Sequence, residues 1–247
     1  MATEVAARLE PLQHQSAPLR NKIIATLRNA IETGLLAPGA RLVERDLCGQ
    51  LNVSRTSLRE ALRELQAEGV VVQTVSRGLT VGTLTREDAE NTYRIRSVLE
   101  ALIVEQFIEQ ATDEDMRQLV KDGEALKSAY RSGDVARMLL SKRTFYDRIC
   151  TGAANAIAFD IINRLVLRTS SLRSRSLKRK ERQQQSIKEI DAIVDAIQRR
   201  DTAAAKRAAI EHVQNSAHSA LGSAEAEIPA VAAPAAPAAK RKRAVEA

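Results

Sequence analysis

The sequence predicts a mainly α-helical protein, with an N-terminal winged helix-turn-helix that carries a small β-hairpin wing and a C-terminal all-helical bundle of six helices. Three observations lead to this fold. Two short apolar periods meet at a corner near residue 52, β-branched runs follow between residues 70 and 81, and apolar residues from 85 to 221 recur only at helical spacing. Aromatic residues make up only 2% of the chain, so aliphatic side chains must fill the core.

The composition limits the class of function. A net charge of +7 among 247 residues favours a polyanionic partner, of which nucleic acid is the simplest. Cys48 and Cys150 are too far apart to indicate a disulfide framework or a zinc finger, which suits a reducing compartment. The sequence has no secretory leader and no apolar run near the roughly 20 residues of a membrane span, so we expect a cytoplasmic protein.

Catalytic chemistry has no recognisable pattern in the sequence. We find no paired nucleophile and base, no glycine-rich phosphate loop and no histidine cluster with metal-ligand spacing. We therefore predict that the protein is not an enzyme.

A DNA-binding domain is predicted at residues 18–84, after a flexible leader at 1–17. Its first helix begins near Pro18 and ends at Gly34, because apolar residues recur at helical spacing between these two signals. Two shorter helices follow, and each has one apolar face. The buried side chains of this pair are predicted to be Leu47, Leu51, Leu58, Ala61, Leu62 and Leu65.

The corner between these two helices has its own sequence signals. Asn52 tolerates left-handed backbone angles, Ser54 is a good N-cap, and Val53 and Leu58 flank that cap as a hydrophobic staple would. The first turn of the second helix then exposes a set of donors that can reach base edges and phosphates, or that are ordinary solvated side chains. These residues are Arg55, Thr56, Ser57 and Arg59.

A β-hairpin is predicted to follow this helix, which Gly69 closes. Residues 70–75 and 79–81 are β-branched runs, and Ser76, Arg77 and Gly78 form the turn between them. Arg77 at the tip is placed either to enter a minor groove or touch a phosphate, or to be a solvated turn residue.

The second domain is predicted at residues 85–222 as an effector-binding and dimerisation bundle. Capping signals at Thr85, Thr112 and Asp201, and a break at Gly133, separate its helices. We place the helices near residues 86–110, 112–131, 133–152, 155–177, 180–200 and 202–221.

The sequence of each of two basic segments allows more than one interpretation. One is an auxiliary anion face or simply a solvated helix surface, and it comprises Arg164, Arg168, Arg173, Arg175, Lys178, Arg179, Lys180 and Arg182. The other is the end of residues 223–247, an alanine- and proline-rich tail that we expect to be disordered. Its basic residues 240–243 resemble a nuclear import signal, but we favour added non-specific DNA affinity or no role.

Residues 18–84 resemble the winged-helix domain of the GntR regulators, and residues 85–221 resemble the FCD effector domain of their FadR subgroup. The motifs that carry the resemblance are Glu-Arg-Asp-Leu at 44–47, Val-Ser-Arg-Thr at 53–56, Leu-Arg-Glu-Ala-Leu at 58–62, Glu-Gly at 68–69 and Arg-Ser-Val-Leu-Glu at 96–100. Asn52 and Ser57 depart from the usual Gly and Pro of the family. The six expected helices resemble its VanR-type branch.

This resemblance implies a homodimer that binds double-stranded DNA at a palindromic operator. Arg45 and Arg55 would read bases, since a guanidinium can bind guanine bidentately, whereas the other contacts would fix the register on phosphates. The implied DNA-binding residues are Arg45, Ser54, Arg55, Thr56, Ser57, Arg59, Arg77 and Gly78.

The effector is expected to be a small organic carboxylate bound in the bundle. Arg96 is the first candidate, because an arginine on an otherwise apolar helix needs an anion to pair with. The alternative is an internal salt bridge to Glu100, one turn further on. Asn155 and His212 are weaker candidates for the same pocket.

The resemblance also bears on metal binding, because many FCD bundles hold a divalent ion with one Asp and three His. Lys142, Tyr146 and Ile190 align with three of these ligand positions, and only His212 survives. We therefore expect no metal. Lys142 either meets the anionic effector in place of the ion, with Tyr146 beside it, or is a surface lysine.

Together these features predict a sequence-specific transcription regulator, most simply a repressor, whose operator binding is modulated by the effector. The alternative is a sequence-tolerant architectural DNA-binding protein whose helical domain only dimerises.

Overall fold

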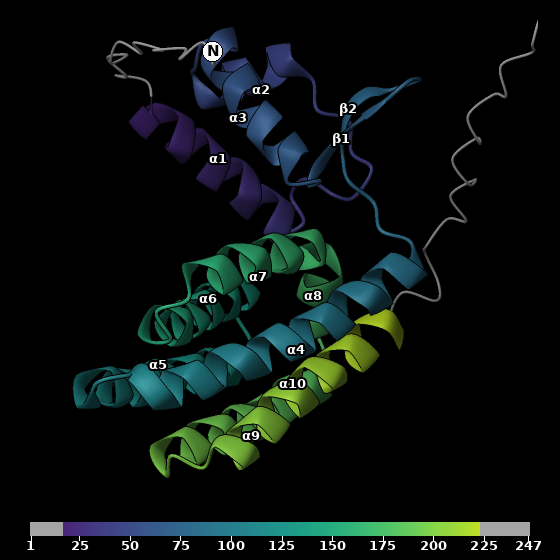
Figure 1. Cartoon of the computed structure of the whole chain (residues 1–247). Helices are drawn as coiled ribbons and strands as arrows, with labels where there is room; N and C mark the ends of the chain where they lie inside the picture. The colour runs from purple at the N-terminus through teal and green to yellow at the C-terminus, as the bar shows by residue number, and fades with distance from the viewer. Residues whose placement is uncertain (1–16, 223–247) are drawn as a thin grey trace, which may run out of the picture.

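The computed structural model describes residues 17–222, which form a small N-terminal domain on top of a helical bundle (Figure 1). The predicted tail at 223–247 and the predicted leader up to residue 16 lie outside the described residues. The N-terminal domain contains α1 (Ala17–Glu32), α2 (Glu44–Leu51), α3 (Arg55–Ala67), β1 (Val71–Thr74) and β2 (Gly78–Val81). The expected winged helix-turn-helix is confirmed.

One aliphatic core holds this domain together. The apolar faces of α1 and α3 pack against each other and against the inner side of the hairpin. Five of the six residues predicted for the buried faces of α2 and α3 are buried in this core, and the sixth, Leu51, is partly buried against it. The hydrophobic periodicity therefore identified the correct helical faces.

The corner before α3 has the predicted geometry. Asn52 adopts a left-handed conformation with φ of 50°, and its backbone N–H donates to the carbonyl of Cys48. The Ser54 hydroxyl accepts a hydrogen bond from the backbone N–H of Ser57 at 3.1 Å, which satisfies one of the donors left free at a helix start. These two residues fix the direction in which α3 leaves the corner.

The hairpin pairs Val71 with Val81 and Thr74 with Gly78, in antiparallel register. Gly78 has φ of 74°, a conformation that a residue with a Cβ adopts only with strain, so the turn depends on this glycine. An isolated antiparallel β-bridge also joins Thr80 of β2 to Arg41, which precedes α2. The wing is thus anchored to the segment that leads into the helix-turn-helix.

The second domain is an all-helical bundle, as expected, but its helix count differs from the prediction. It consists of α4 (Arg86–Gln110), α5 (Asp113–Ser132), α6 (Val135–Gly152), α7 (Ala156–Arg168), α8 (Ser170–Leu177), α9 (Lys180–Gln198) and α10 (Thr202–Gly222). Six helices were expected, and the described residues form seven because the predicted helix at 155–177 is divided. The long helices α4 and α10 run side by side (Figure 1).

Thr169 divides that helix. Its backbone has φ of −96° and ψ of 7°, and its hydroxyl donates to the carbonyl of Leu165. Hydroxyl side chains compete with the helical hydrogen-bond ladder in this way, and Thr169 is followed by Ser170 and Ser171. The chain therefore changes direction between α7 and α8.

The predicted caps of the other helices are confirmed. Thr112 and Asp115 form a reciprocal capping box, Thr85 accepts from the N–H of Asp88, and Gly133 ends α5 with φ of 72°. Asp201 caps α10 by accepting from the N–H of Ala204. Across residues 17–222, no helix is long and apolar enough to cross a membrane.

The two domains meet along α1, α7 and α8. Figure 1 shows α7 and α8 on the side of the bundle that faces α1, and α1 packs directly against α8. Leu167 of α7 is buried in the aliphatic core of the DNA-binding domain and not in that of the bundle. This contact brings side chains of both domains to the same cavity.

Replacing Asn52 tests the geometry of the corner. We expect Asn52→Ala to lower the free energy of unfolding by about 1 kcal/mol, because alanine pays more than asparagine for the left-handed conformation. Asn52→Gly is the matched control and should be neutral or slightly stabilising. Urea unfolding of the three proteins measures the difference, and equal midpoints for Ala and Gly would contradict a strained corner.

Candidate functional site

The first turn of α3 is the most exposed polar surface of the helix-turn-helix. Arg55 and Thr56 are exposed and make no side-chain hydrogen bond or ion pair within the described part of the chain. The hydroxyls of Ser54 and Ser57 lie 3.0 Å apart and bond to each other. Arg55 and Thr56 are therefore free to reach a ligand, whereas the two serines are already engaged in capping the helix.

The other two arginines of this surface have acidic neighbours. Arg59 on α3 pairs with Glu44 on α2, with Nε 2.8 Å from Oε2, and so ties the two helices together. Arg45 pairs with the adjacent Asp46 at 3.2 Å, and its side chain is 83% exposed. An exposed pair of this kind is worth little energy, so Arg45 can exchange its partner for a phosphate or a base at low cost.

The wing places Arg77 at the tip of the hairpin, exposed to solvent beside Gly78. It lies between β1 and β2, three residues beyond Thr74, whose hydroxyl donates to the carbonyl of Gly78 and closes the turn. Arg77 and the first turn of α3 belong to the same small domain, so one rigid unit presents both.

A second candidate site is a cavity of about 370 Å³ at the junction of the two domains. The bundle supplies its inner end through Arg96 and Glu100 of α4, Lys142 and Tyr146 of α6, and Arg173 of α8. Helices α1 and α3 of the DNA-binding domain supply part of its rim. This volume suits a small organic molecule.

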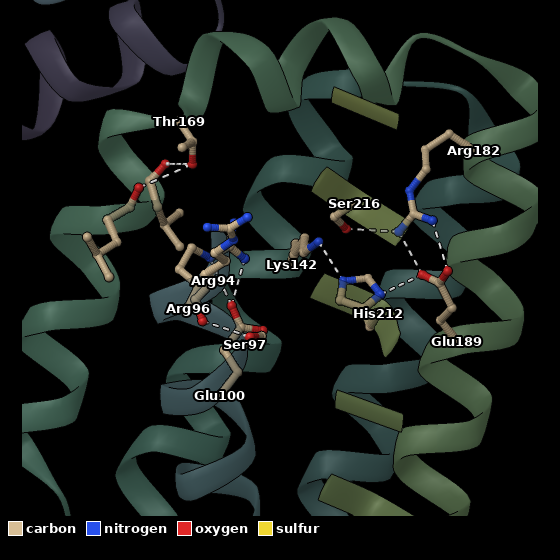
Figure 2. A network of polar contacts seen from close by, with 12 residues as sticks. Arg94, Arg96, Ser97, Glu100, Lys142, Thr169, Arg182, Glu189, His212 and Ser216 are labelled. Carbon is tan, nitrogen blue, oxygen red and sulfur yellow. Dashed lines mark hydrogen bonds and ion pairs between the residues drawn. The ribbon is translucent and has the colours of Figure 1, made fainter. Parts of the chain in front are cut away.

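Arg96 and Glu100 form a buried ion pair at the inner end of the cavity (Figure 2). Both side chains are about 1% exposed, and Oε1 of Glu100 accepts from Nη2 of Arg96 at 2.6 Å and from Nε at 3.0 Å. The predicted internal salt bridge therefore exists. Nη1 of Arg96 and Oε2 of Glu100 nevertheless have no hydrogen-bond partner among the described residues, so each can still bind a ligand.

Lys142 begins a chain of polar contacts across the bundle (Figure 2). Its Nζ lies 2.9 Å from Nε2 of His212, and Nδ1 of His212 lies 2.6 Å from Oε2 of Glu189. Arg182 then holds both carboxylate oxygens of Glu189, at 2.9 and 2.6 Å. Because the ionised carboxylate of Glu189 can only accept, Nδ1 of His212 donates to it, and the neutral ring then accepts from Lys142 at Nε2.

The electrostatics of these groups follow from burial. Burial, together with the guanidinium groups of Arg173 and Arg96, holds the pKa of Lys142 well below its usual range. Burial and the nearby Lys142 lower the pKa of His212 to about 4, against the opposing effect of Glu189. Burial raises the pKa of Glu100, but the combined attraction of Arg96, His212 and Lys142 outweighs it, so the pKa of this carboxyl lies below its ordinary value.

Three of the five predicted effector residues line the cavity, namely Arg96, Lys142 and Tyr146. Lys142 is only 3% exposed, so the alternative of a surface lysine is wrong. His212 lies behind Lys142 and is outside the cavity lining. Asn155 is also outside it, because its side chain caps α7 through the N–H of Ala158 and donates to Gln106. Its short polar side chain is used at a helix start, where asparagine is favoured.

Arg173 and Arg182 are functional candidates that the sequence did not single out. Both belong to the basic run at 164–182, which was interpreted as either an anion face or a solvated surface, and both are buried. Arg173 lines the cavity, and its Nε has no hydrogen-bond partner in residues 17–222. The run is thus divided, because Arg168, Lys178, Arg179 and Lys180 remain exposed.

The positions that align with the metal ligands of other FCD domains lie near one another, but their side chains are not the Asp and His ligands of those domains. Lys142 faces His212, while Ile190 is buried in the bundle core. No group of three His, Cys, Asp or Glu residues that could hold a metal ion occurs in residues 17–222. The absence of a bound metal stays a prediction.

The stability of the protein should decrease when His212 has to be protonated. Its pKa falls from 6.5 to about 4 on folding, so between these values the unfolded chain binds more protons and stability rises with pH. From pH 7 to pH 5 we expect His212 to account for a loss of about 2 kcal/mol, measured by urea unfolding. His212→Gln should have a flatter profile over this range. Parallel profiles of the two proteins would contradict a neutral, buried His212.

Comparisons with known proteins agree with this architecture. Residues 19–81 match the family described as bacterial regulatory proteins, gntR family, and residues 91–215 match the FCD domain. The chain is 35% identical over 107 residues to the uncharacterized HTH-type transcriptional regulator YdhC of Bacillus subtilis, which covers 43% of this chain and 48% of YdhC. This match therefore spans about half the length of that relative.

Two further proteins match over most of their length. The HTH-type transcriptional repressor RspR of Escherichia coli is 25% identical over 210 residues, which is 85% of this chain and 90% of RspR. The solved structure of E. coli McbR/YncC superposes with a TM-score of 0.71 at 24% identity, over 79% of this chain and 93% of that one. At this identity the superposition supports the fold alone. Because the two domain matches together cover most of the chain, the protein belongs to the GntR family of bacterial regulatory proteins and carries an FCD domain.

Proposed function

We propose that this protein is a transcription regulator that binds a palindromic operator as a homodimer and whose DNA affinity is modulated by a small carboxylate. The observation that carries the DNA-binding part is the unpaired, exposed Arg55 on the first turn of α3, next to the Asn52 corner that directs this turn outward. Helices of this motif read the major groove with these N-terminal residues. Arg45 on α2 and Arg77 at the tip of the hairpin are exposed arginines of the same domain. Repression is proposed because the relative RspR is named a repressor.

Support for the carboxylate comes from the charges buried around the cavity. Four cationic side chains, Arg96, Lys142, Arg173 and Arg182, are buried in the bundle, and the buried carboxylates that pair with members of this group are Glu100 and Glu189. The third buried carboxylate, Asp122, pairs with Arg148 instead. Buried charge is costly unless it is paired, and the unsatisfied Nη1 of Arg96 and Nε of Arg173 are donors that suit a carboxylate. An anion in this cavity would reduce the excess of positive charge.

Support for the homodimer comes from an apolar stripe on α4. Ile95, Val98 and Leu102 are 51%, 68% and 37% exposed, and their spacing puts them on one face of the helix. Large exposed apolar side chains in one row are typical of an interface. A second copy of the chain that covers this row would bring two DNA-binding domains together, as a two-fold symmetric operator requires.

Arg55→Ala tests the role of α3 in DNA reading. The whole protein is first used to select a binding site from a library of random DNA sequences, and we call the resulting DNA the selected duplex. On this duplex we expect the variant to lose about 1–3 kcal/mol of binding free energy, because a bidentate base contact disappears. On a scrambled duplex the loss should be much smaller. Fluorescence anisotropy at fixed salt measures both. An equal loss on the two duplexes would mean that Arg55 contacts only phosphate, and would favour the architectural alternative.

Arg173→Gln tests the role of the cavity in the response to carboxylates. We expect this variant to bind the selected duplex normally but to lose at least about tenfold in affinity for the carboxylates that shift DNA binding of the unmodified protein, since a charged hydrogen bond is removed. A panel of small mono- and hydroxycarboxylates is titrated by calorimetry. Arg207→Gln, an exposed arginine of α10, is the control. An unchanged response in Arg173→Gln would remove the cavity from the mechanism.

A further inference from the structure

The cavity between the two domains has two ends of opposite charge. Its inner end contains Arg96, Lys142 and Arg173 against the single carboxylate of Glu100. Its rim contains more acids than bases, with Arg28, Arg143 and Arg164 against five carboxylates. These are Glu32, Glu64, Glu68, Asp147 and Asp160. Three of the five, Glu32, Glu64 and Glu68, belong to α1 and α3 of the DNA-binding domain or to the residue that caps α3.

The acids at the rim are only partly neutralised by protein. Glu68 pairs with Arg28 through Oε1, but its Oε2 is buried without a hydrogen-bond partner in the described chain. Glu32 and Asp160 form no hydrogen bond or ion pair within residues 17–222. Asp147 and Glu64 have only long contacts of 3.7 Å, to Arg143 and Arg20. The rim therefore keeps several acceptors that a cationic donor can use.

A cluster of surface acids alone would not define a site, but the inner end supplies independent evidence. Arg96 and Glu100 are both about 1% exposed, line the cavity, and each keeps one polar atom without a partner. Nine-tenths of the Arg173 side chain is also buried, and its Nε is likewise unpaired. Buried polar groups that lack protein partners are expected to meet a ligand or water.

The two ends face each other across one space. The carboxylate of Glu32, on α1, is the strongest favourable charge acting on the buried Arg173 guanidinium of α8, although burial still lowers the pKa of that arginine. The two side chains line the same cavity and form no direct ion pair. A molecule that lies between them can thus meet a cation at one end and an anion at the other.

We propose that the cavity takes an amphoteric ligand, with its carboxylate at Arg96 and Arg173 and its ammonium group at the acidic rim around Glu32 and Glu68. The chemical class is an ω-amino carboxylate or a basic amino acid. This inference rests on the proposed carboxylate effector and specifies its other end. It differs from a plain carboxylate site because the rim repels an anion and attracts a cation.

The position of the rim gives this ligand a direct effect on DNA binding. Its carboxylate contacts only the bundle, whereas its ammonium group contacts α1 and the end of α3, the helix that carries Arg55. The ligand therefore bridges the two domains and stabilises the arrangement in which Leu167 is docked into the DNA-binding domain. A ligand that differs in affinity between two arrangements shifts their populations by that difference.

The test compares matched ligands on the full chain by isothermal titration calorimetry. The amino carboxylates are γ-aminobutyrate, δ-aminovalerate and ε-aminocaproate, and each is paired with butyrate, valerate or caproate and with the corresponding simple amine. We expect at least one amino carboxylate to bind about tenfold or more tightly than its unsubstituted partner, because an ammonium group gains charged hydrogen bonds at the rim. The simple amines should bind more weakly than either.

Two variants locate the ammonium group. Glu32→Gln should reduce the affinity ratio of amino carboxylate to unsubstituted carboxylate severalfold, whereas Glu211→Gln, an equal change of charge on an exposed residue of α10, should leave the ratio as it was. Thermal melting confirms that both variants are folded. The selected duplex supplies a second readout, since at saturation the bridging ligand should change DNA affinity more than its unsubstituted partner does.

The outcomes separate this inference from the proposed function. If the unsubstituted carboxylates bind as tightly as the amino carboxylates, or if Glu32→Gln and Glu211→Gln behave alike, the amphoteric ligand is wrong and the carboxylate effector stands. If no member of the series binds, the amphoteric ligand is overturned, and the panel of mono- and hydroxycarboxylates decides separately on the carboxylate effector. A higher affinity for the amino carboxylates that disappears in Glu32→Gln supports the assignment of both ends.

Discussion

The excess of buried positive charge in the bundle is the constraint on which the functional architecture depends. A bundle with a mostly aliphatic core encloses Arg96, Lys142, Arg173 and Arg182, and the buried carboxylates that pair with members of this group are Glu100 and Glu189. Isolated charges in such an interior cost several kcal/mol each, and ion pairs recover this cost only with good geometry. Glu189 is well matched, since Arg182 and His212 both bind it. The Arg96 pair leaves one nitrogen unsatisfied, which is where a ligand can act.

Lys142 connects this charge to the rest of the bundle. Its side-chain nitrogen faces the imidazole of His212, while Glu189 binds the other side of the ring. Its neighbours Arg96 and Arg173 lower its pKa after the larger effect of burial. An anion brought into the cavity would offset those repulsions, so ligand binding and the protonation of Lys142 are physically linked.

The cavity also depends on how the two domains are docked. The break at Thr169 turns α8 away from the direction of α7, and this places Arg173 at the inner end while Leu167 enters the aliphatic core of the DNA-binding domain. Glu32 and Glu68 reach the rim only because α1 and α3 rest on this side of the bundle. The cavity lining therefore includes residues of the bundle and of α1 and α3.

The sequence by itself determined the elements whose causes are local. The helical faces of α2 and α3, the left-handed corner at Asn52, the Ser54 cap and the hairpin turn at Gly78 depend on neighbours within a few residues, so periodicity and turn chemistry identify them. Tertiary structure alone decided which basic residues are buried and that Asn155, which caps α7, lies outside the cavity lining. These properties depend on partners distant in the chain, such as His212 for Lys142 and Glu32 for Arg173, and charge burial is set by those neighbours and not by sequence spacing.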